Sequence, residues 1–273
     1  MFTSLSPAVK AWIFVLGVLA TSWATASIAG GLVLAISPLL MTLLMMFVIT
    51  RDGYSRRGWQ QMGFLRLGFR WWPVTLLVTA GVSALSYAVA VAVGAASLDG
   101  LAPTAGPDLL SLSISGPILA FAEEIGWRGY LQSHLREKTG QFWSWIIVGA
   151  IWVTWHLSYI LLTPFYHADG DRTLVLSLFT ANVLAFSVLF GVLRDVSGSM
   201  WVAVLAHFAH NAAFAWIGAN VITAEDPIVV NEYVAGDTGA MVLLGTTVSA
   251  VALILYSRLR RRATLTTAPR SGK

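Results

Sequence analysis

Long apolar runs separated by short polar connections make up most of the chain. The runs are bounded by charged residues, Gly or Pro and cover residues 11–29, 32–49, 73–95, 109–133, 143–162, 174–193, 200–222 and 239–257. About 20 consecutive apolar residues cross the hydrocarbon core of a bilayer as a helix, whereas a transmembrane barrel shows short segments of alternating polarity. The pattern therefore predicts an all-α, polytopic integral membrane protein with about eight transmembrane helices.

Composition agrees with this prediction and narrows the chemistry. Of the 273 residues, 57% are hydrophobic and 11% are charged, compared with about 25% charged residues in soluble domains. In a membrane protein, basic residues mostly reflect the orientation of the helices in the bilayer. The formal net charge of +4 therefore does not indicate a nucleic-acid partner, and we expect the lipid bilayer as a partner. Because the chain has no cysteine, it has no disulfide, thiolate metal ligand or cysteine nucleophile.

Charged residues also orient the predicted helices. Basic residues occupy alternate connections and the end of the chain, at Lys10, 51–70, 136–138, Arg194 and 258–273, while the other connections are acidic apart from Arg172. Cytoplasmic loops collect Lys and Arg, so we expect both termini on the cytoplasmic side of the cell membrane. The first run is longer than the core of a signal peptide, and we expect a retained helix; cleavage near Ala24-Thr25-Ala26 is the alternative.

The chain is expected to divide into three regions. Residues 1–50 form a scaffold of two helices, residues 51–222 form a core that contains the candidate site, and residues 223–273 form a last transmembrane helix with a basic cytoplasmic tail. Within the core, Arg56 to Trp72 mixes four arginines with aromatic residues and is predicted to lie along the cytoplasmic interface.

Three of the predicted spans contain side chains that are costly to place in a bilayer. Such residues mark functional sites by default. In chain order they are Glu123, Glu124, Arg128, His156, His207, His210 and Asn211. We expect them to line one polar cavity inside the helical bundle. His134 and His167 are instead expected in connections outside the core.

Helical spacing separates the roles of the two adjacent glutamates. Residues four apart share a helix face, whereas adjacent residues differ by about 100°. Glu124 is therefore predicted to form a buried structural ion pair with Arg128. Glu123 lies on the face of Trp127 without a local cation, and it is the candidate general base.

The same spacing groups the polar residues of the other two spans. His207 and Asn211 are four residues apart and are predicted to project together, as are Trp152 and His156. His210 is either a supporting residue of the site or a bystander.

Three motifs, in this order on three helices, carry a resemblance to a known family. Glu123-Glu124-x-x-x-Arg128, Trp152-x-x-x-His156 and His207-x-x-x-Asn211 resemble those of the CPBP (Abi) family of intramembrane proteases, which includes type II CAAX prenyl endopeptidases and bacteriocin-processing enzymes. The resemblance covers residues 55–215 and departs at Trp152, where the family usually has Phe. It implies a protease core within residues 51–222, with eight helices around a conical cavity that opens toward cytosol and lipid.

The resemblance also implies a reaction. In it, Glu123, helped by His156, deprotonates a water molecule that attacks a peptide carbonyl, and His207 and Asn211 stabilise the oxyanion. Supporting roles are expected for Glu124, Arg128, Trp152 and His210. The implied substrate is a membrane-associated or lipid-modified protein or peptide. No metal or other cofactor is expected, and no oligomeric state is predicted.

Four alternatives stay open. A zinc-dependent intramembrane metalloprotease would use Glu123, His156 and His207 as its three protein ligands, although no His-Glu-x-x-His sequence is present. A serine protease is weakly supported, because no Gly-x-Ser-x-Gly or Ser-x-x-Lys motif occurs. A proton-coupled transporter would use Glu123 and the histidines as a relay, but no inverted repeat is detectable. The fourth alternative is a catalytically silent membrane scaffold or immunity protein.

Overall fold

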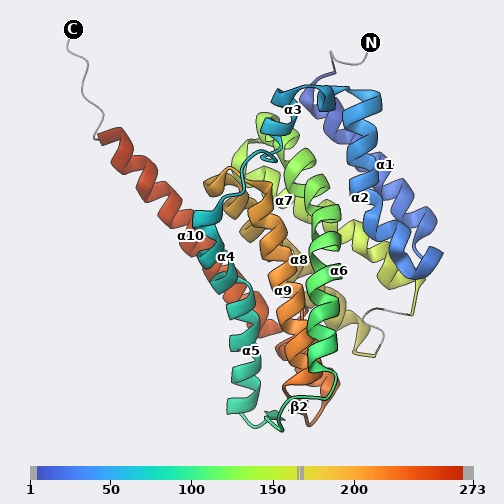
Figure 1. Cartoon of the computed structure of the whole chain (residues 1–273), viewed down its shortest axis with the longest axis vertical. Coiled ribbons are helices and arrows are strands. Elements are labelled where there is room, and N and C mark those ends of the chain that lie inside the picture. Colours follow the sequence, from blue (N-terminus) through green and yellow to red (C-terminus); the bar gives the residue numbers. More distant parts are fainter. Residues whose placement is uncertain (1–4, 165, 167–168, 267–273) are drawn as a thin grey trace.

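The computed structural model describes residues 5–164, 166 and 169–266, with the side chains of 261 and 263–266 left out. The described chain is a bundle of helices (Figure 1) with one short antiparallel pairing between β1 (Ala96–Ser97) and β2 (Thr223–Ala224). The prediction of an all-α membrane protein is confirmed.

The helices follow the predicted apolar runs closely. In chain order they are α1 (Pro7–Thr25), η1 (Ile28–Gly31), α2 (Leu32–Leu44), η2 (Met45–Ile49), η3 (Asp52–Tyr54), α3 (Arg56–Gln61), η4 (Phe69–Trp71), α4 (Trp72–Val78), α5 (Ala80–Ala92), α6 (Ala105–Glu124), η5 (Ile125–Leu131), α7 (Gln132–Leu162), α8 (Arg172–Ser197), α9 (Met200–Asn220), η6 (Val229–Val234) and α10 (Ala240–Thr266). The third predicted run is not one helix, because the backbone breaks at Thr79 between α4 and α5.

Seven helical stretches of the described chain are long and apolar enough to cross a membrane, one fewer than the predicted eight. The difference lies in Ala105–Leu162, a continuous stretch of 58 residues that contains both the fourth and the fifth predicted run. At 1.5 Å per residue this stretch is far longer than one bilayer crossing needs. Its backbone leaves helical geometry at Gly140, with φ 78° and ψ 174°. The positive φ suits glycine and divides the stretch into two crossings.

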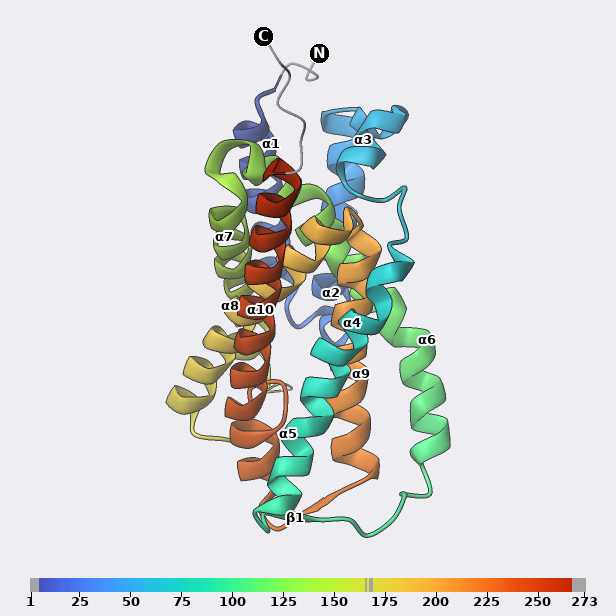
Figure 2. The ribbon, with the colours of Figure 1, turned by 90° about the vertical axis from the view of Figure 1, so that its left-hand side faces the viewer.

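The first and last long helices bring both ends of the described chain to one end of the molecule. Helix α1 begins there and α10 ends there, whereas β1 and β2 lie at the opposite end (Figures 1 and 2). Both termini on one side agree with an even number of crossings. That this side is cytoplasmic stays a prediction from the basic residues.

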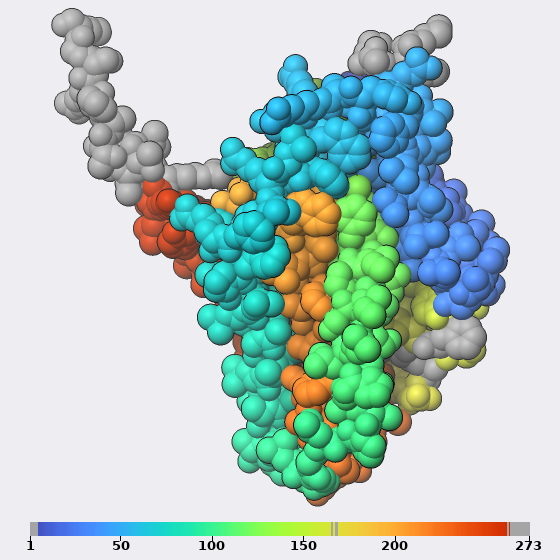
Figure 3. All heavy atoms as spheres, viewed as in Figure 1, coloured from blue at the N-terminus to red at the C-terminus, as the bar shows by residue number. Residues whose placement is uncertain are grey.

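Apolar side chains cover the outside of the bundle in helical stripes. On α6, Leu110, Ile114 and Ile118 follow each other four residues apart and are 63%, 59% and 62% exposed. On the face seen in Figure 3, α6 and α5 flank α9, and both contact it. Soluble proteins rarely expose apolar surface this extensive, so these stripes are the surface that faces the acyl chains.

Small residues let the helices that carry the site approach each other closely. A Cβ on Gly116 of α6 would lie 2.7 Å from the ring of Phe208 on α9. A Cβ on Gly149 of α7 would lie 2.9 Å from Ser187 of α8, whose hydroxyl also donates to the Trp145 carbonyl at 2.8 Å. These contacts set the spacing of α6, α7, α8 and α9 around the site.

The two N-terminal helices pack against the segment that follows the glutamates. The ring of Phe14 on α1 contacts Trp127 edge-on and stacks on Tyr130, with centroid distances of 6.0 and 5.3 Å. Gly126 lies so close to Pro38 of α2 that a Cβ there would approach it to 2.7 Å. Residues 1–50 therefore support the helix that carries Glu123 and Glu124 directly.

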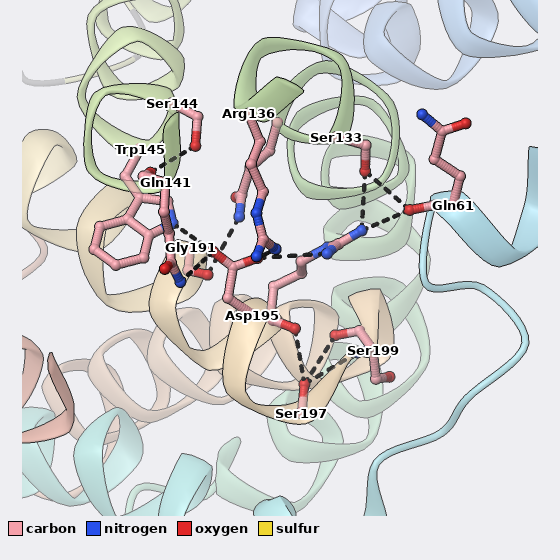
Figure 4. Close-up of polar contacts among 12 residues, drawn as sticks. Gln61, Ser133, Arg136, Gln141, Ser144, Trp145, Gly191, Asp195, Ser197 and Ser199 are labelled. Atoms are coloured by element: carbon pink, nitrogen blue, oxygen red, sulfur yellow. Dashed lines mark hydrogen bonds and ion pairs between the residues drawn. The ribbon is translucent and has the colours of Figure 1, made fainter. Parts of the chain in front are cut away.

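A polar cluster joins α7, α8 and the end of α3 (Figure 4). The fully buried carboxylate of Asp195 accepts hydrogen bonds from Arg136 at 2.8 Å, Gln141 at 2.9 Å and Trp145 at 3.1 Å. Beside it, Arg194 donates to the Gln61 carbonyl at 2.7 Å. The cluster fixes the part of α7 on either side of Gly140 to the end of α8 and the end of α3.

One of the two histidines expected in connections is placed differently. His134 lies inside α7, is 5% exposed, and its Nδ1 is 2.8 Å from the Tyr130 carbonyl. The prediction was wrong because Arg136 and Lys138 nearby suggested a solvated loop. His167 lies outside the described residues.

Candidate active site

A cavity of about 90 Å³ inside the bundle collects the predicted polar residues of three helices. Glu123 comes from the end of α6, His156 from α7, and His207, His210 and Asn211 from α9. A cavity of this size holds several water molecules when polar groups line it. Glu124 and Arg128 are not among the lining residues of this cavity, and both side chains are completely buried.

The backbone after the two glutamates is not the regular helix that the apolar pattern predicted for 109–133. Seven residues, Ile125–Leu131, form a π-helix, and every one of them is buried. Single π turns inside helices are rare and often occur at functional sites. A π turn holds more residues than an α turn, so the helix faces after it are rotated relative to a regular helix.

Glu123 is held by two tryptophans. The indole Nε1 of Trp152 donates to its Oε2 at 2.9 Å, and the indole Nε1 of Trp127 donates to the same oxygen at 3.4 Å. The carboxylate keeps partial exposure to the cavity. The predicted position of Glu123 beside Trp127 is confirmed, while the contribution of Trp152 could not be read from the sequence.

Glu124 accepts two hydrogen bonds on one oxygen. Its Oε1 lies 2.8 Å from Arg128 NH1, which confirms the predicted ion pair, and 2.9 Å from His207 Nδ1. An ionised carboxylate only accepts hydrogen bonds, so Nδ1 of His207 carries the hydrogen. Glu124 therefore fixes the ring of His207 as well as Arg128, a role that the spacing did not indicate.

Aromatic rings surround the buried guanidinium. The Cζ of Arg128 lies 4.3 Å from the ring centroid of Trp152 and 5.1 Å from that of Phe190. Two of its nitrogens, Nε and NH2, have no hydrogen-bond partner in the described part of the chain. Cation–π contacts with the two rings offset part of that loss. Trp152 therefore contacts both Glu123 and the ion pair.

His156 and His210 are oriented by different partners. Nδ1 of His156 lies 3.0 Å from the Trp152 carbonyl, an acceptor, so Nδ1 carries the hydrogen and Nε2 of the neutral ring is an acceptor. Nδ1 of His210 lies 2.9 Å from the hydroxyl of Ser83 on α5. The sequence left open whether His210 supports the site or is a bystander. The structure places His210 on the cavity wall.

Asn211 is the most exposed of the polar residues from α9. It lies one turn beyond His207 on the cavity wall. Its side-chain amide has both a donor and an acceptor. The four-residue spacing thus correctly predicts that His207 and Asn211 reach the same cavity.

Two polar residues of the cavity were missed by the sequence analysis. Tyr166, from the connection before α8, donates a hydrogen bond to the carboxylate of Asp237, which precedes α10. Burial and the nearby Asp237 carboxylate raise the pKa of Tyr166 well above its usual value, so the hydroxyl keeps its proton. Both residues lie in connections, where helical periodicity gives no signal.

Two larger cavities adjoin the first. One of about 450 Å³ is lined mainly by apolar residues of α2, α6 and α7 and reaches Glu123 and His156. The other, of about 430 Å³, lies between the ends of α5 and α9 and the connections before α8 and α10. The site is therefore accessible from an apolar side and from a polar side.

The described residues do not assemble a metal site. No group of three or more His, Asp or Glu side chains in this part of the chain is arranged to hold a metal ion. In particular, Glu123, His156 and His207 line one cavity without forming a ligand cluster.

Comparison with known proteins identifies the segment that carries the site. Residues 104–213 match the family described as type II CAAX prenyl endopeptidase Rce1-like. The matched segment is less than half of the chain, and the chain is similar to the Rce1-like family through it. None of the curated proteins matches the chain. The apolar helices make the chain an integral membrane protein.

The Rce1-like segment contains all three motifs, from Glu123 to Asn211. It begins later than residue 55, where the resemblance predicted that the match would start. Residues 55–103 lie outside it, although α5 supplies Ser83 to His210.

Proposed function

We propose that the chain is an intramembrane endopeptidase that hydrolyses a peptide bond of a membrane-associated or lipid-modified protein or peptide. The position of Glu123 supports this most directly. Its partly exposed carboxylate lies on the wall of both the polar cavity and the large apolar cavity. Water and an apolar peptide segment can therefore reach it from different sides.

The surroundings of Glu123 suit a general base. Both indole hydrogen bonds end on Oε2, and no side chain in the described chain donates to Oε1. Oε1 then takes a proton from a cavity water as the water oxygen attacks the peptide carbonyl carbon. Nε2 of His156, an acceptor in the neutral ring, accepts the second hydrogen of that water and orients it.

The oxyanion that forms on the carbonyl is stabilised from α9. Asn211 donates from its amide, and His207 donates from Nε2. Because Nδ1 of His207 already donates to Glu124, a donating Nε2 requires the protonated ring, whose charge Glu124 balances. Two donors aimed at the developing charge lower the barrier to its formation.

Collapse of the intermediate completes the reaction. The carbon–nitrogen bond breaks, and Glu123 returns the proton to the leaving nitrogen as a general acid. The products are a carboxylate and an amine, and Glu123 is regenerated as the base. Arg128 and Trp152 take no proton; they hold Glu124 and Glu123 in position.

The apolar cavity is the proposed path for the substrate. Leu32 and Leu34 of α2, Leu119 of α6 and Trp155 of α7 line it, and Glu123 and His156 lie at its inner end. An extended apolar segment or a lipid-modified residue would leave the bilayer along these side chains. The proposed location is the cell membrane, with both termini in the cytoplasm.

Comparison of membrane proteomes tests this function. Cells carrying wild-type protein, Glu123→Gln or Glu225→Gln would be compared for new peptide termini, with Glu225 as a control because it is exposed and lines no cavity described above. We expect fragments that occur with wild type and with Glu225→Gln and that disappear with Glu123→Gln. Identical sets of termini in all three strains would overturn the proposal.

A further inference from the structure

A cavity of about 300 Å³ lies where η4 and α4 meet the last helix, α10. Its lining residues are Arg70 and Trp71 of η4, Val74 of α4, and Leu253 and Tyr256 of α10. The rings of Trp71 and Tyr256 make an edge-on contact with centroids 6.2 Å apart, and α4 lies beside α10 (Figures 1 and 2). The described linings of the three cavities around the candidate active site include none of these residues. This cavity is therefore a separate one.

The cavity lies at the level of the bilayer surface. The two membrane-crossing stretches that form it are Phe69–Ala92 and Ala240–Arg260. Arg70 is next to the start of the first stretch, and Tyr256 is about one turn before the end of the second. That end of α10 is the end of the molecule at which the termini lie (Figures 1 and 2). Trp and Tyr side chains are enriched at this depth, where acyl chains meet headgroups.

The segment before the cavity also has the character of a membrane surface. Leu67 and Phe69 are 46% and 61% exposed, and the neighbouring Arg66 and Arg70 are exposed as well. Exposed apolar side chains that alternate with arginines suit an environment in which hydrocarbon and headgroups are both within reach. Arg70 therefore lies where a lipid headgroup can reach its guanidinium.

The polar side chains of the cavity offer hydrogen-bond donors. The guanidinium of Arg70, the indole of Trp71 and the hydroxyl of Tyr256 make no hydrogen bond or ion pair within the described part of the chain. Arg and Trp side chains only donate. No Asp or Glu occurs among the described lining residues of this cavity. One positive charge with two further donors favours an anion that has several acceptor oxygens, such as a phosphate group.

The rest of the lining is apolar and lies deeper in the membrane. Val74 follows Arg70 by four residues, and Leu253 precedes Tyr256 by three, so each lies about one helical turn further from the bilayer surface. A soluble phosphate would leave these side chains uncovered. A phospholipid would cover them, because its acyl chains extend from the same headgroup toward the middle of the bilayer.

We propose that this cavity binds one anionic phospholipid, with its phosphate on the three donors and the upper part of an acyl chain against Val74 and Leu253. Basic pockets between transmembrane helices bind anionic headgroups in this way. A zwitterionic lipid has the same phosphate, but it adds an ammonium group for which the described lining supplies no carboxylate. The bound lipid would join α4 to α10 at the bilayer surface.

Lipid binding to the delipidated full-length protein in a neutral detergent tests the site. The probes would be phosphatidylglycerol, phosphatidylcholine with the same acyl chains, and glycerol 3-phosphate, with bound molecules counted by native mass spectrometry. We expect phosphatidylglycerol to bind about tenfold more tightly than phosphatidylcholine, about the factor that one hydrogen bond to a charged group provides. It should also raise the melting temperature, since a ligand that binds only the folded state stabilises it.

Three variants distinguish this cavity from general attraction to basic residues. Arg70→Gln should abolish the preference for phosphatidylglycerol, and Val74→Trp should weaken its binding by filling the apolar part while keeping the charge. Arg258→Gln is the matched control, because it removes the same charge from an exposed position on α10 that does not line the cavity. This control should bind phosphatidylglycerol as wild type does.

Three results would overturn the proposal. They are equal affinity of the wild type for the two lipids, a preference for phosphatidylglycerol that survives Arg70→Gln, and binding of glycerol 3-phosphate as tight as that of the lipid. The first and third comparisons use only wild-type protein, so they stand even if a variant fails to fold. None of the measurements involves Glu123 or cleavage, so the lipid site and the proposed function are tested separately.

Discussion

The indole nitrogen of Trp152 donates a hydrogen bond to Oε2 of Glu123 at 2.9 Å, and the same ring lies 4.3 Å from the guanidinium carbon of Arg128. Trp152 thus connects the proposed base to the buried ion pair. The family that the motifs resemble usually has Phe here, which keeps the ring and lacks the donor. The Trp in this chain therefore changes the hydrogen bonding of the base more than the shape of the pocket.

The first prediction follows from that hydrogen bond. Trp152→Phe should lower kcat by about tenfold or more, because a hydrogen bond to a charged group contributes about 1.5–3 kcal/mol, and should change the melting temperature little. Cleavage kinetics and thermal unfolding in detergent measure the two effects. Trp143→Phe, on the same helix with a 60% exposed side chain, is the matched control. Unchanged kcat in Trp152→Phe would show that Trp127 alone suffices to hold Glu123.

The second prediction separates the adjacent glutamates. Glu123→Gln should abolish turnover and leave the melting temperature nearly unchanged, because Glu123 is partly exposed and has no cation partner in the described chain. Glu124→Gln should destabilise the fold by about 3–5 kcal/mol, since it leaves the completely buried Arg128 without its counterion. Thermal unfolding of both variants distinguishes them. Near-native turnover by Glu123→Gln on a substrate cleaved by wild type would rule out Glu123 as the base.

The spacing of residues along the sequence was sufficient to predict contacts within one helix. The four-residue interval predicted the ion pair of Glu124 with Arg128, and apolar run length predicted the helices that cross the membrane. Both follow from the geometry of a single helix, which the sequence encodes over a few turns.

Contacts between helices could not be predicted in the same way. Glu124 and His207 are 83 residues apart, and an apolar period indicates which face is buried without indicating which helix covers it. The π-helix Ile125–Leu131 leaves no mark in the apolar pattern, because all its residues are buried whichever period they follow. Asp237 and Tyr166 reach the cavity from connections, whose paths depend on the assembled bundle.

The third prediction concerns orientation in the membrane. The chain has no native cysteine, so single cysteines report accessibility without background. Ser55→Cys, at the end of the molecule where the termini lie, should resist a membrane-impermeant thiol reagent in intact cells, and Ser97→Cys in β1 should react. Both serines are exposed, whereas Thr238, in another acidic connection, is completely buried and unsuitable. Labelling of Ser55→Cys together with protection of Ser97→Cys would reverse the proposed topology.

The fourth prediction tests the oxyanion donors against a zinc mechanism, which makes the opposite demand on Asn211. Asn211→Ala should lower kcat by roughly 10²–10³-fold with little change in KM, because a donor used only in the transition state is lost. Asn211→Asp should be no more active, since an ionised carboxylate accepts hydrogen bonds and repels the oxyanion. In a zinc enzyme the Asp variant would be tolerated or improved, because Asp is a competent zinc ligand.

Cleavage by purified wild type, Asn211→Ala and Asn211→Asp would be measured before and after exhaustive chelation, with metal content determined for each. Ala209→Gly, beside the motif on the same helix, controls for general perturbation of α9. We expect chelation to leave wild-type activity unchanged, because Glu123, His156 and His207 do not form a ligand cluster in the described part of the chain. Stoichiometric zinc, activity that is lost on chelation and restored by zinc, and an active Asn211→Asp variant would together replace the proposed mechanism with a metal-dependent one.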